Sequence, residues 1–260
     1  MLSKIYQEDH FFRKHPKIQE TLQRITLPEN VILKEECLQF EGSGYFLGNT
    51  NPIRNNYGIM LYTVSHMYYI GKWVNNRKEG YGILVSEDGS HYSGEWYRDK
   101  PHGKGEYFNP DGSWSYSGRW KYGEMDGEGI ERYPDGTEFR GNFKNSQKNG
   151  KGKFTFSNPK CTFRGMFVDD KATGRGIQQG LNYTYEGEWK ENIIDGVGRC
   201  LYRDEAGNIV EEYIGQFKNG LKSGYGEYKF QNGQLYKGEW EEGQMKSVGV
   251  FVSKDCGLFS

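Results

Sequence analysis

The residue types that most often bind metals or form nucleophilic sites are few and widely separated in this chain of 260 residues. No two of its four cysteines form a CxxC pair, and its five histidines do not fall at zinc-ligand spacing with them. Adjacent acids such as Glu241 and Glu242 are expected in turns, where water solvates both carboxylates. We therefore expect neither a bound metal nor a cofactor. The residues considered are Cys37, Cys161, Cys200, Cys256, His10, His15, His66, His91 and His102.

Sequence motifs for nucleotide binding and hydrolysis are also missing, although 37 glycines give them many chances to arise. The chain contains no GxGxxG, P-loop, HExxH or GxSxG pattern. We therefore predict that the protein is not an enzyme. A role as the regulatory subunit of an enzyme stays open as an alternative.

Charge is balanced over the whole chain but unevenly placed along it. The 34 basic and 35 acidic residues do not favour nucleic acid as a partner. Between Phe139 and Val168 there is no acid, whereas the stretch from Asn182 to Glu212 is rich in acids. The cations of the first stretch suit a phosphoinositide headgroup, an acidic tubulin tail or the acidic stretch of a second copy, although solvated strand faces explain them too. This basic block comprises Arg140, Lys144, Lys148, Lys151, Lys153, Lys160 and Arg164.

The glycines belong to a repeat in which an aromatic residue, any residue, glycine, any residue and a second aromatic residue follow one another. Successive copies start 23, 24, 23, 24, 22, 28 and 23 residues apart. Eight copies at this regularity indicate a repeat architecture whose ordered core is built from rings. The anchors are Tyr69, Gly71, Trp73, Tyr92, Gly94, Trp96, Tyr116, Gly118, Trp120, Phe139, Gly141, Phe143, Phe163, Gly165, Phe167, Tyr185, Gly187, Trp189, Tyr213, Gly215, Phe217, Tyr236, Gly238 and Trp240.

Seven copies also carry a Gly-x-Gly pair, such as Gly103 and Gly105, about nine residues after the first glycine, and the eighth copy is reduced to Ser247-Val248-Gly249. Both halves of the unit show the period of two that is typical of strands. Dipeptides such as Asp88-Gly89 and Asn232-Gly233 lie between copies and predict tight primed turns with two positive φ angles. The unit is therefore strand, loop, strand and turn. Within it, a glycine between two rings leaves a slot that a ring of the neighbouring strand can fill.

A unit such as residues 92–105, followed by Asp111-Gly112, resembles the MORN repeat. Eight clear copies and one degenerate copy, which starts at Phe46, cover residues 41–253. The resemblance implies an all-β fold: an elongated, twisted, single-layer antiparallel sheet of tandem β-hairpins. It also implies a scaffold or partner-binding surface without chemistry of its own.

Residues 1–40 precede the array and residues 254–260 follow it. In the N-terminal extension, Pro16 is followed by Ile18, Leu22 and Ile25 at helical spacing, which predicts a short amphipathic helix that ends before Pro28. Such a helix either caps the open edge of the first repeat or serves as a docking arm for a partner.

The resemblance suggests a non-catalytic scaffold in a cytoskeletal assembly, located in the cytoplasm. A chain made almost wholly of such repeats is similar to the repeat portion of ciliary radial-spoke-head proteins, which points to the axoneme. The alternative is a peripheral membrane adaptor whose basic block binds phosphoinositide. Expected partners are other proteins of a larger assembly, a second copy or acidic lipid headgroups. The side chains expected to face away from the rings and contact a partner are Ile70, Lys72, Arg119, Arg140, Arg164, Met166, Glu186, Glu188 and Ile214.

Overall fold

The computed structural model describes residues 38–41, 44–49, 53–62 and 64–253. The predicted helix at residues 16–27 lies outside these ranges. The chain forms two compact units: unit 1 comprises residues 1–134 and 144–146, and unit 2 comprises residues 135–143 and 147–260. All regular secondary structure of the described residues is β-strand, as predicted. Within these residues, no helix is long and apolar enough to cross a membrane.

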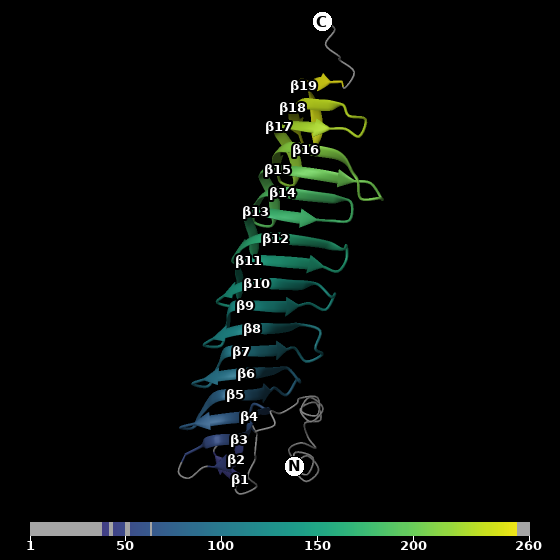
Figure 1. The fold of residues 1–260 in the computed structure, drawn as a ribbon. Coiled ribbons are helices and arrows are strands. Elements are labelled where there is room, and N and C mark those ends of the chain that lie inside the picture. Colours follow the sequence, from purple (N-terminus) through teal and green to yellow (C-terminus); the bar gives the residue numbers. More distant parts are fainter. Residues whose placement is uncertain (1–37, 42–43, 50–52, 63, 254–260) are drawn as a thin grey trace. The chain divides into compact units, whose positions relative to one another are not determined.

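Unit 1 is an antiparallel sheet in which each strand pairs with the next strand along the chain (Figure 1). This up-and-down order follows from the short turns, which leave a strand no other neighbour to pair with. The strands are β1 (Leu38–Glu41), β2 (Gly44–Asn49), β3 (Asn55–Tyr62), β4 (Met67–Val74), β5 (Arg77–Val85), β6 (His91–Tyr97), β7 (Lys100–Phe108), β8 (Ser115–Lys121) and β9 (Glu124–Arg132).

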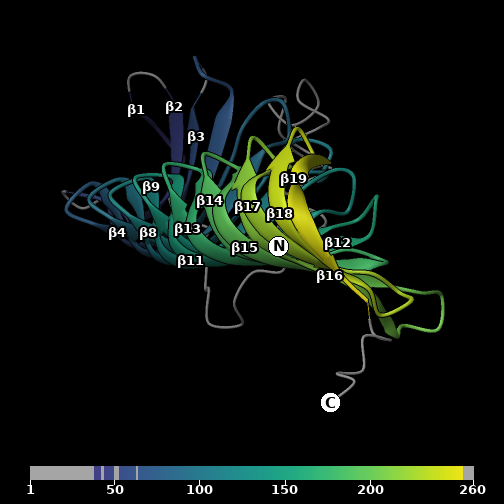
Figure 2. The same cartoon turned by 90° about the horizontal axis from the view of Figure 1, so that it is seen from above.

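Unit 2 repeats the same arrangement, and its strands are visibly curved when seen from above (Figure 2). Its last strand carries exposed apolar side chains, including Val248, Val250 and Phe251. The strands are β10 (Glu138–Lys144), β11 (Gln147–Phe156), β12 (Cys161–Val168), β13 (Lys171–Gln179), β14 (Tyr183–Lys190), β15 (Ile193–Arg203), β16 (Ile209–Lys218), β17 (Leu221–Lys229), β18 (Leu235–Glu241) and β19 (Gln244–Val252).

The register places glycine opposite glycine on neighbouring strands. In unit 1, for example, Gly94 of β6 lies opposite both Gly82 of β5 and Gly105 of β7. The same row crosses unit 2 through Gly176, Gly187 and Gly198. The rows follow from the repeat, because each antiparallel pairing aligns the central glycine of one half-unit with the second glycine of the next.

A ring covers each glycine pair, and it comes from the same strand as one of the glycines rather than from the neighbouring strand. The hydroxyl of Tyr92 lies so close that a Cβ atom would be 2.6 Å from it at Gly94 and 2.3 Å from it at Gly105. That hydroxyl donates a hydrogen bond of 2.8 Å to the carbonyl of Glu95. The prediction of a slot is therefore correct, but its occupant is local. A tyrosine two residues before a glycine can bend over it without any long-range contact.

The rings of successive repeats then meet edge to face. Tyr69 contacts Trp73 at 5.1 Å and Trp96 at 5.3 Å between ring centroids, and Tyr92 repeats this pattern with Trp96 and Trp120. The indole N–H of Trp96 donates to the carbonyl of Gly82 at 3.0 Å. Edge-to-face pairs are favourable beyond the area that they bury. We call the side of each sheet that carries these rings the ring face and the opposite side the second face.

The turns correct the expectation about primed geometry. At Asp88-Gly89 only Gly89 has a positive φ, of 94°. The Asp88 carboxylate accepts hydrogen bonds from the backbone N–H and the hydroxyl of Ser90, at 2.9 and 2.7 Å, and thereby stabilises a longer loop. Pairs of residues with positive φ occur instead at the other end of the hairpins, as at Arg98-Asp99 (48° and 67°). The long hairpin of β15 and β16 arises from longer strands around the turn at residues 204–208.

Candidate partner-binding groove

A continuous row of side chains crosses the second face of unit 2. The antiparallel register brings these residues together although about ten or more positions separate neighbours along the chain. Each member of the row lies directly opposite the next, in the order Lys153, Arg164, Ile177, Glu186, Arg199, Ile214, Glu227, Lys237 and Val250.

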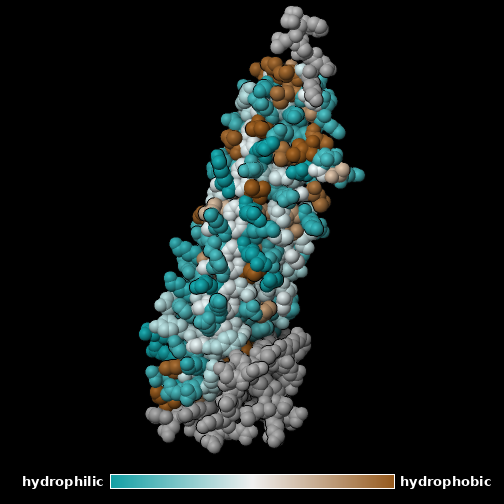
Figure 3. Space-filling model, in the orientation of Figure 1, coloured by the Kyte–Doolittle hydropathy of each residue, from teal (hydrophilic) through white to brown (hydrophobic). Residues whose placement is uncertain are grey.

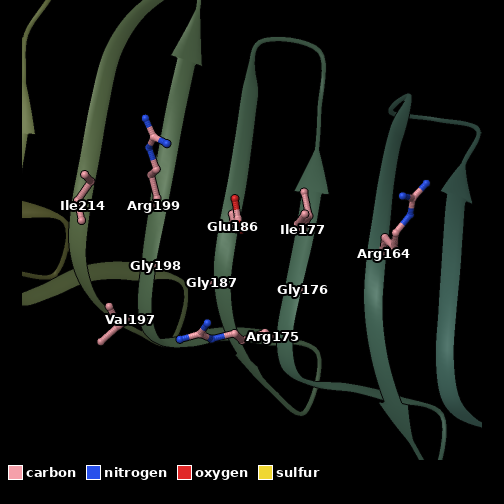
Figure 4. Close-up of a pocket in the computed structure, with 10 residues that line it drawn as sticks. All are labelled: Arg164, Arg175, Gly176, Ile177, Glu186, Gly187, Val197, Gly198, Arg199 and Ile214. Carbon is pink, nitrogen blue, oxygen red and sulfur yellow. The ribbon is translucent and has the colours of Figure 1, made fainter.

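Part of this row forms one wall of an open groove of about 570 Å³. In Figure 4 the side chains of Arg164, Ile177, Glu186, Arg199 and Ile214 lie in a line on one side of the glycine row. The other wall is formed by Arg175 and Val197, and the floor between the walls contains Gly176, Gly187 and Gly198. The glycines keep the floor low because they have no side chain.

The groove combines cations with exposed apolar groups. Arg164 and Arg175 are exposed, and Arg199 forms an ion pair with Glu212. Ile177, Val197 and Ile214 are 42, 56 and 47 % exposed, which is high for aliphatic side chains on a sheet. Figure 3 shows the same mixture of hydrophobic side chains among hydrophilic ones on the visible surface of β11–β19. Such a surface suits a segment that presents carboxylates and apolar side chains together.

The MORN repeat is the family whose sequence model matches this chain. The match covers more than half of the chain, at residues 69–91, 92–114, 116–138, 139–158, 185–206, 213–235 and 236–255. The chain belongs to the MORN-repeat family. The copy at Phe163 is not among the matched segments, yet its strands β12 and β13 pair Gly165 with Gly176 as the other copies do. MORN repeats are generally non-catalytic and suggest a scaffold or a protein- or membrane-interaction role.

Among curated proteins, the chain is similar to Alsin. It is 40 % identical to Alsin of Rattus norvegicus and 37 % identical to Alsin of Homo sapiens, over 73 residues in each case. These residues are 26 % of this chain and 4 % of either relative, so the chain spans only a small part of the relatives that it matches.

Similarity to two solved structures is weak. The TCP domain of SAS-4 (dCPAP) in complex with a proline-rich motif of Ana2 (dSTIL), from Drosophila melanogaster, has a TM-score of 0.37 at 10 % identity. That likeness covers 80 % of this chain and 99 % of the domain. BamB from Moraxella catarrhalis has a TM-score of 0.17 at 10 % identity, over 77 % of this chain and 80 % of BamB. Neither score indicates a shared fold.

The basic block of the MORN array does not form one patch. Lys148 is 9 % exposed on the ring face, where its Nζ atom lies 5.3 Å from the ring centroid of Phe139 and 3.5 Å from an Asp170 carboxylate oxygen. Lys160 lies in the turn between β11 and β12, and Lys144 is grouped with unit 1. Lys148 is buried and Lys160 lies in a turn. Neither of them joins the cations of the second face.

The remaining four cations of the block do share the second face of unit 2. Lys153 lies opposite Arg164, and Lys151 lies opposite Met166. Because Gly141 faces Gly152, the antiparallel register places Arg140 opposite Lys153. Arg140, Lys153 and Arg164 thus form a row of three cations on neighbouring strands. Arg140 also contacts Glu138 at 3.2 Å.

The side chains expected to face away from the rings lie on the second face, but two of them are not free to contact a partner. Ile70 is only 2 % exposed. The Glu188 carboxylate accepts a hydrogen bond of 3.0 Å from the N–H of Val197. Lys72, in contrast, is exposed. Arg164, Glu186 and Ile214 line the groove.

Sequence reasoning missed the other half of the groove. Arg175, Ile177, Val197 and Arg199 come from the Gly-x-Gly strands, whose alternation places them on the second face. The period of two in those strands was the signal that could have found them. Which of them would lie beside Arg164 or Glu186 depended on the register between strands.

Unit 1 has a groove at the equivalent position of its own second face, also of about 570 Å³. Its lining is more polar. The Tyr81 and Ser93 hydroxyls are 2.7 Å apart, and Ser117 donates to a Glu106 carboxylate oxygen at 2.8 Å. These hydrogen bonds satisfy polar groups internally, so the groove of unit 2 offers the more accessible apolar contacts. Among the residues that the structure describes, no group of three or more His, Cys, Asp or Glu side chains could hold a metal ion.

Proposed function

We propose that this MORN protein is a non-catalytic scaffold that holds another protein in the second-face groove of unit 2. The observation that carries the proposal is the groove itself, in which three arginines and three exposed aliphatic side chains line a floor of glycines. The expected partner segment carries acidic side chains at intervals that match the arginines and apolar side chains between them. Charge complementarity of this kind gives specificity and speeds association.

We infer that the scaffold works in a cytoskeletal assembly, with the ciliary axoneme as the most specific candidate, because a chain composed mainly of MORN repeats is similar to the repeat portion of radial-spoke-head proteins.

The first test is a pull-down from an extract of ciliated cells at physiological salt, with bound proteins identified by mass spectrometry. Replacing Arg164 and Arg175 together by glutamate is expected to reduce recovery of the specific partner about tenfold or more, because two attractive charges become repulsive. A matched variant with Lys218→Glu and Lys229→Glu, which lies in unit 2 outside the groove, is expected to recover it normally. Equal recovery by both variants would overturn the groove proposal, and stoichiometric partners unrelated to the cytoskeleton would overturn the axonemal one.

A second candidate function is peripheral membrane binding, which the row formed by Arg140, Lys153 and Arg164 favours. We expect the protein to float with vesicles that contain phosphatidylinositol bisphosphate and not with phosphatidylserine vesicles of equal charge. The double variant Lys153→Glu and Arg164→Glu should lose this recruitment, while Lys160→Glu in the turn should keep it. Absence of flotation at physiological salt would remove this candidate.

A further inference from the structure

Six apolar side chains on the second face of unit 1 are almost completely buried. They form two rows across β3, β4 and β5, in which Ile59, Ile70 and Ile83 lie opposite one another in sequence and Leu61, Tyr68 and Val85 do the same. Their exposed fractions are between 0 and 4 %. We call these six residues the apolar block.

The burial of the apolar block requires a cover. Unit 1 is a single sheet in its described part, and the rings lie on its other face together with Met60 and Trp73. Side chains on the second face of a single sheet face water unless another segment lies over them. The equivalent rows of unit 2 show the difference, because Ile177, Ile214 and Val252 are 42, 47 and 44 % exposed.

The cover is local to the first strands. On β6, the residues that continue the two rows are Ser93 and His91, which lie opposite Ile83 and Val85. Both are polar and only half-buried. The change from apolar to polar residues marks the border of the covered area and limits the cover to about three strands, or roughly 10 Å across the sheet.

The length of chain before β1 identifies the candidate for this cover. Unit 1 begins at Met1, and 37 residues precede Leu38. The segments between described strands of this region, at residues 42–43, 50–52 and 63, are too short to cover six side chains. A helix carrying Ile18, Leu22 and Ile25 would present an apolar stripe about 10 Å long, which matches the width of the block.

We propose that residues 1–37 dock on the apolar block through Ile18, Leu22 and Ile25. The second face of unit 1 is thus a binding surface for an amphipathic segment, and the chain supplies the occupant itself. This role differs from capping the open edge of the first repeat, because the contact is with side chains of a sheet face and not with backbone groups of β1. A partner with a similar apolar stripe would compete with residues 1–37 for the same surface.

Photo-crosslinking of the full chain tests the position of the occupant. A benzophenone amino acid at position 22 keeps an apolar side chain there, and its crosslinks are expected to fall on peptides from β3–β5. The same amino acid at position 23, on the polar side of the predicted helix, should not crosslink to the block. Crosslinks from position 22 only to unit 2, to the edge strand β1 or to none of these peptides would overturn the proposal. Crosslinks between two chains would show that a second copy supplies the cover.

Hydrogen exchange of the full chain tests whether the contact protects the sheet. Leu22→Glu is expected to speed amide exchange in β3–β5 about tenfold and to leave β14–β18 unchanged, while the charge-matched Gln23→Glu behaves as the wild type. Unchanged exchange in Leu22→Glu, or equal acceleration in both variants, would contradict the proposal. Faster exchange throughout both units would indicate global unfolding, and the crosslinks from position 22 then decide the question.

Discussion

Replacing Gly118 by valine is expected to lower the free energy of unfolding by about 3–5 kcal/mol, as large disruptions of a packed core do. A Cβ atom at this position would lie 2.4 Å from the Tyr116 hydroxyl and 2.6 Å from the Cα atom of Gly129. The tyrosine is fully buried and its hydroxyl donates to the carbonyl of Arg119 at 2.9 Å, so the ring cannot move away without losing that bond. The neighbouring strand would have to shift as well.

The midpoint of urea unfolding, followed by tryptophan fluorescence, measures this effect. Arg119→Val is the matched control, because it introduces the same side chain at the next residue of β8, on the exposed second face. We expect that control to stay within about 0.5 kcal/mol of the wild type. Equal midpoints for Gly118→Val and the wild type would show that the ring does not need the glycine pair.

Replacing Lys222 by glutamate is expected to destabilise the protein by about 2–3 kcal/mol, less than the roughly 3–5 kcal/mol of a fully buried uncompensated charge because Lys222 is half-buried. The Nζ atom of Lys222 lies 4.2 Å from the ring centroid of Tyr228 and 4.9 Å from that of Trp240, with Tyr202 and Tyr213 also within 5.3 Å. Ring faces attract a cation and repel an anion. A carboxylate here would also approach Glu211, which accepts a hydrogen bond from the Tyr228 hydroxyl.

Lys222→Met is the matched control for this prediction. Methionine occupies the equivalent position in two other repeats, where Met125 lies opposite Trp120 and Met245 opposite Trp240. A thioether packs well against rings, so we expect a change of less than about 1.5 kcal/mol in the free energy of unfolding. Thermal unfolding of both variants gives the comparison. Equal melting temperatures for Lys222→Glu and Lys222→Met would contradict a cation-specific ring cage.

The contribution of Lys222 to the free energy of unfolding also depends on pH. Burial lowers the pKa of Lys222, so its folded-state pKa lies below its unfolded-state pKa. The folded state then binds fewer protons between the two values, and the contribution of Lys222 to stability rises as pH rises through that window. The neighbouring Tyr213, whose pKa burial raises to about 12, acts in the opposite direction above pH 10. Tyr213 is present in both the wild type and Lys222→Met, so its effect drops out when their free energies of unfolding are compared. As pH rises, we expect the free energy of unfolding of the wild type to increase relative to that of Lys222→Met.

Much of the fold was predictable because the structure of each repeat depends on residues that lie close together in the sequence. The alternation of rings and glycines in residues 92–96 places Tyr92, Gly94 and Trp96 on one face without reference to any other strand. The positions of the turns were also predictable from Asp88-Gly89, although their type was not. That type depends on hydrogen bonds from Ser90, which favour a longer loop over a primed turn.

Much less of the candidate groove was predictable. Arg164, Glu186 and Ile214 were recognised as facing away from the rings, but Arg175 and Arg199 were not placed beside them. Lys148 belongs to the basic block in the sequence but does not lie on the second face with Lys153. It lies an even number of residues before Gly150 and Gly152 on the same strand, so it shares their ring face. A charge run is divided between the two faces of the strands that carry it, so only some of its residues share a patch.

The family, the strands and the ring face follow from the amino-acid sequence alone, since all three come from a pattern repeated within about 23 residues. The folded sheet was needed to show which side chains of different strands share a groove and why Ile70 is buried while Ile177 is exposed. Alternation along a strand is a local property. The neighbours across a sheet, and any segment that lies over it, are set by register and docking between residues far apart in the chain.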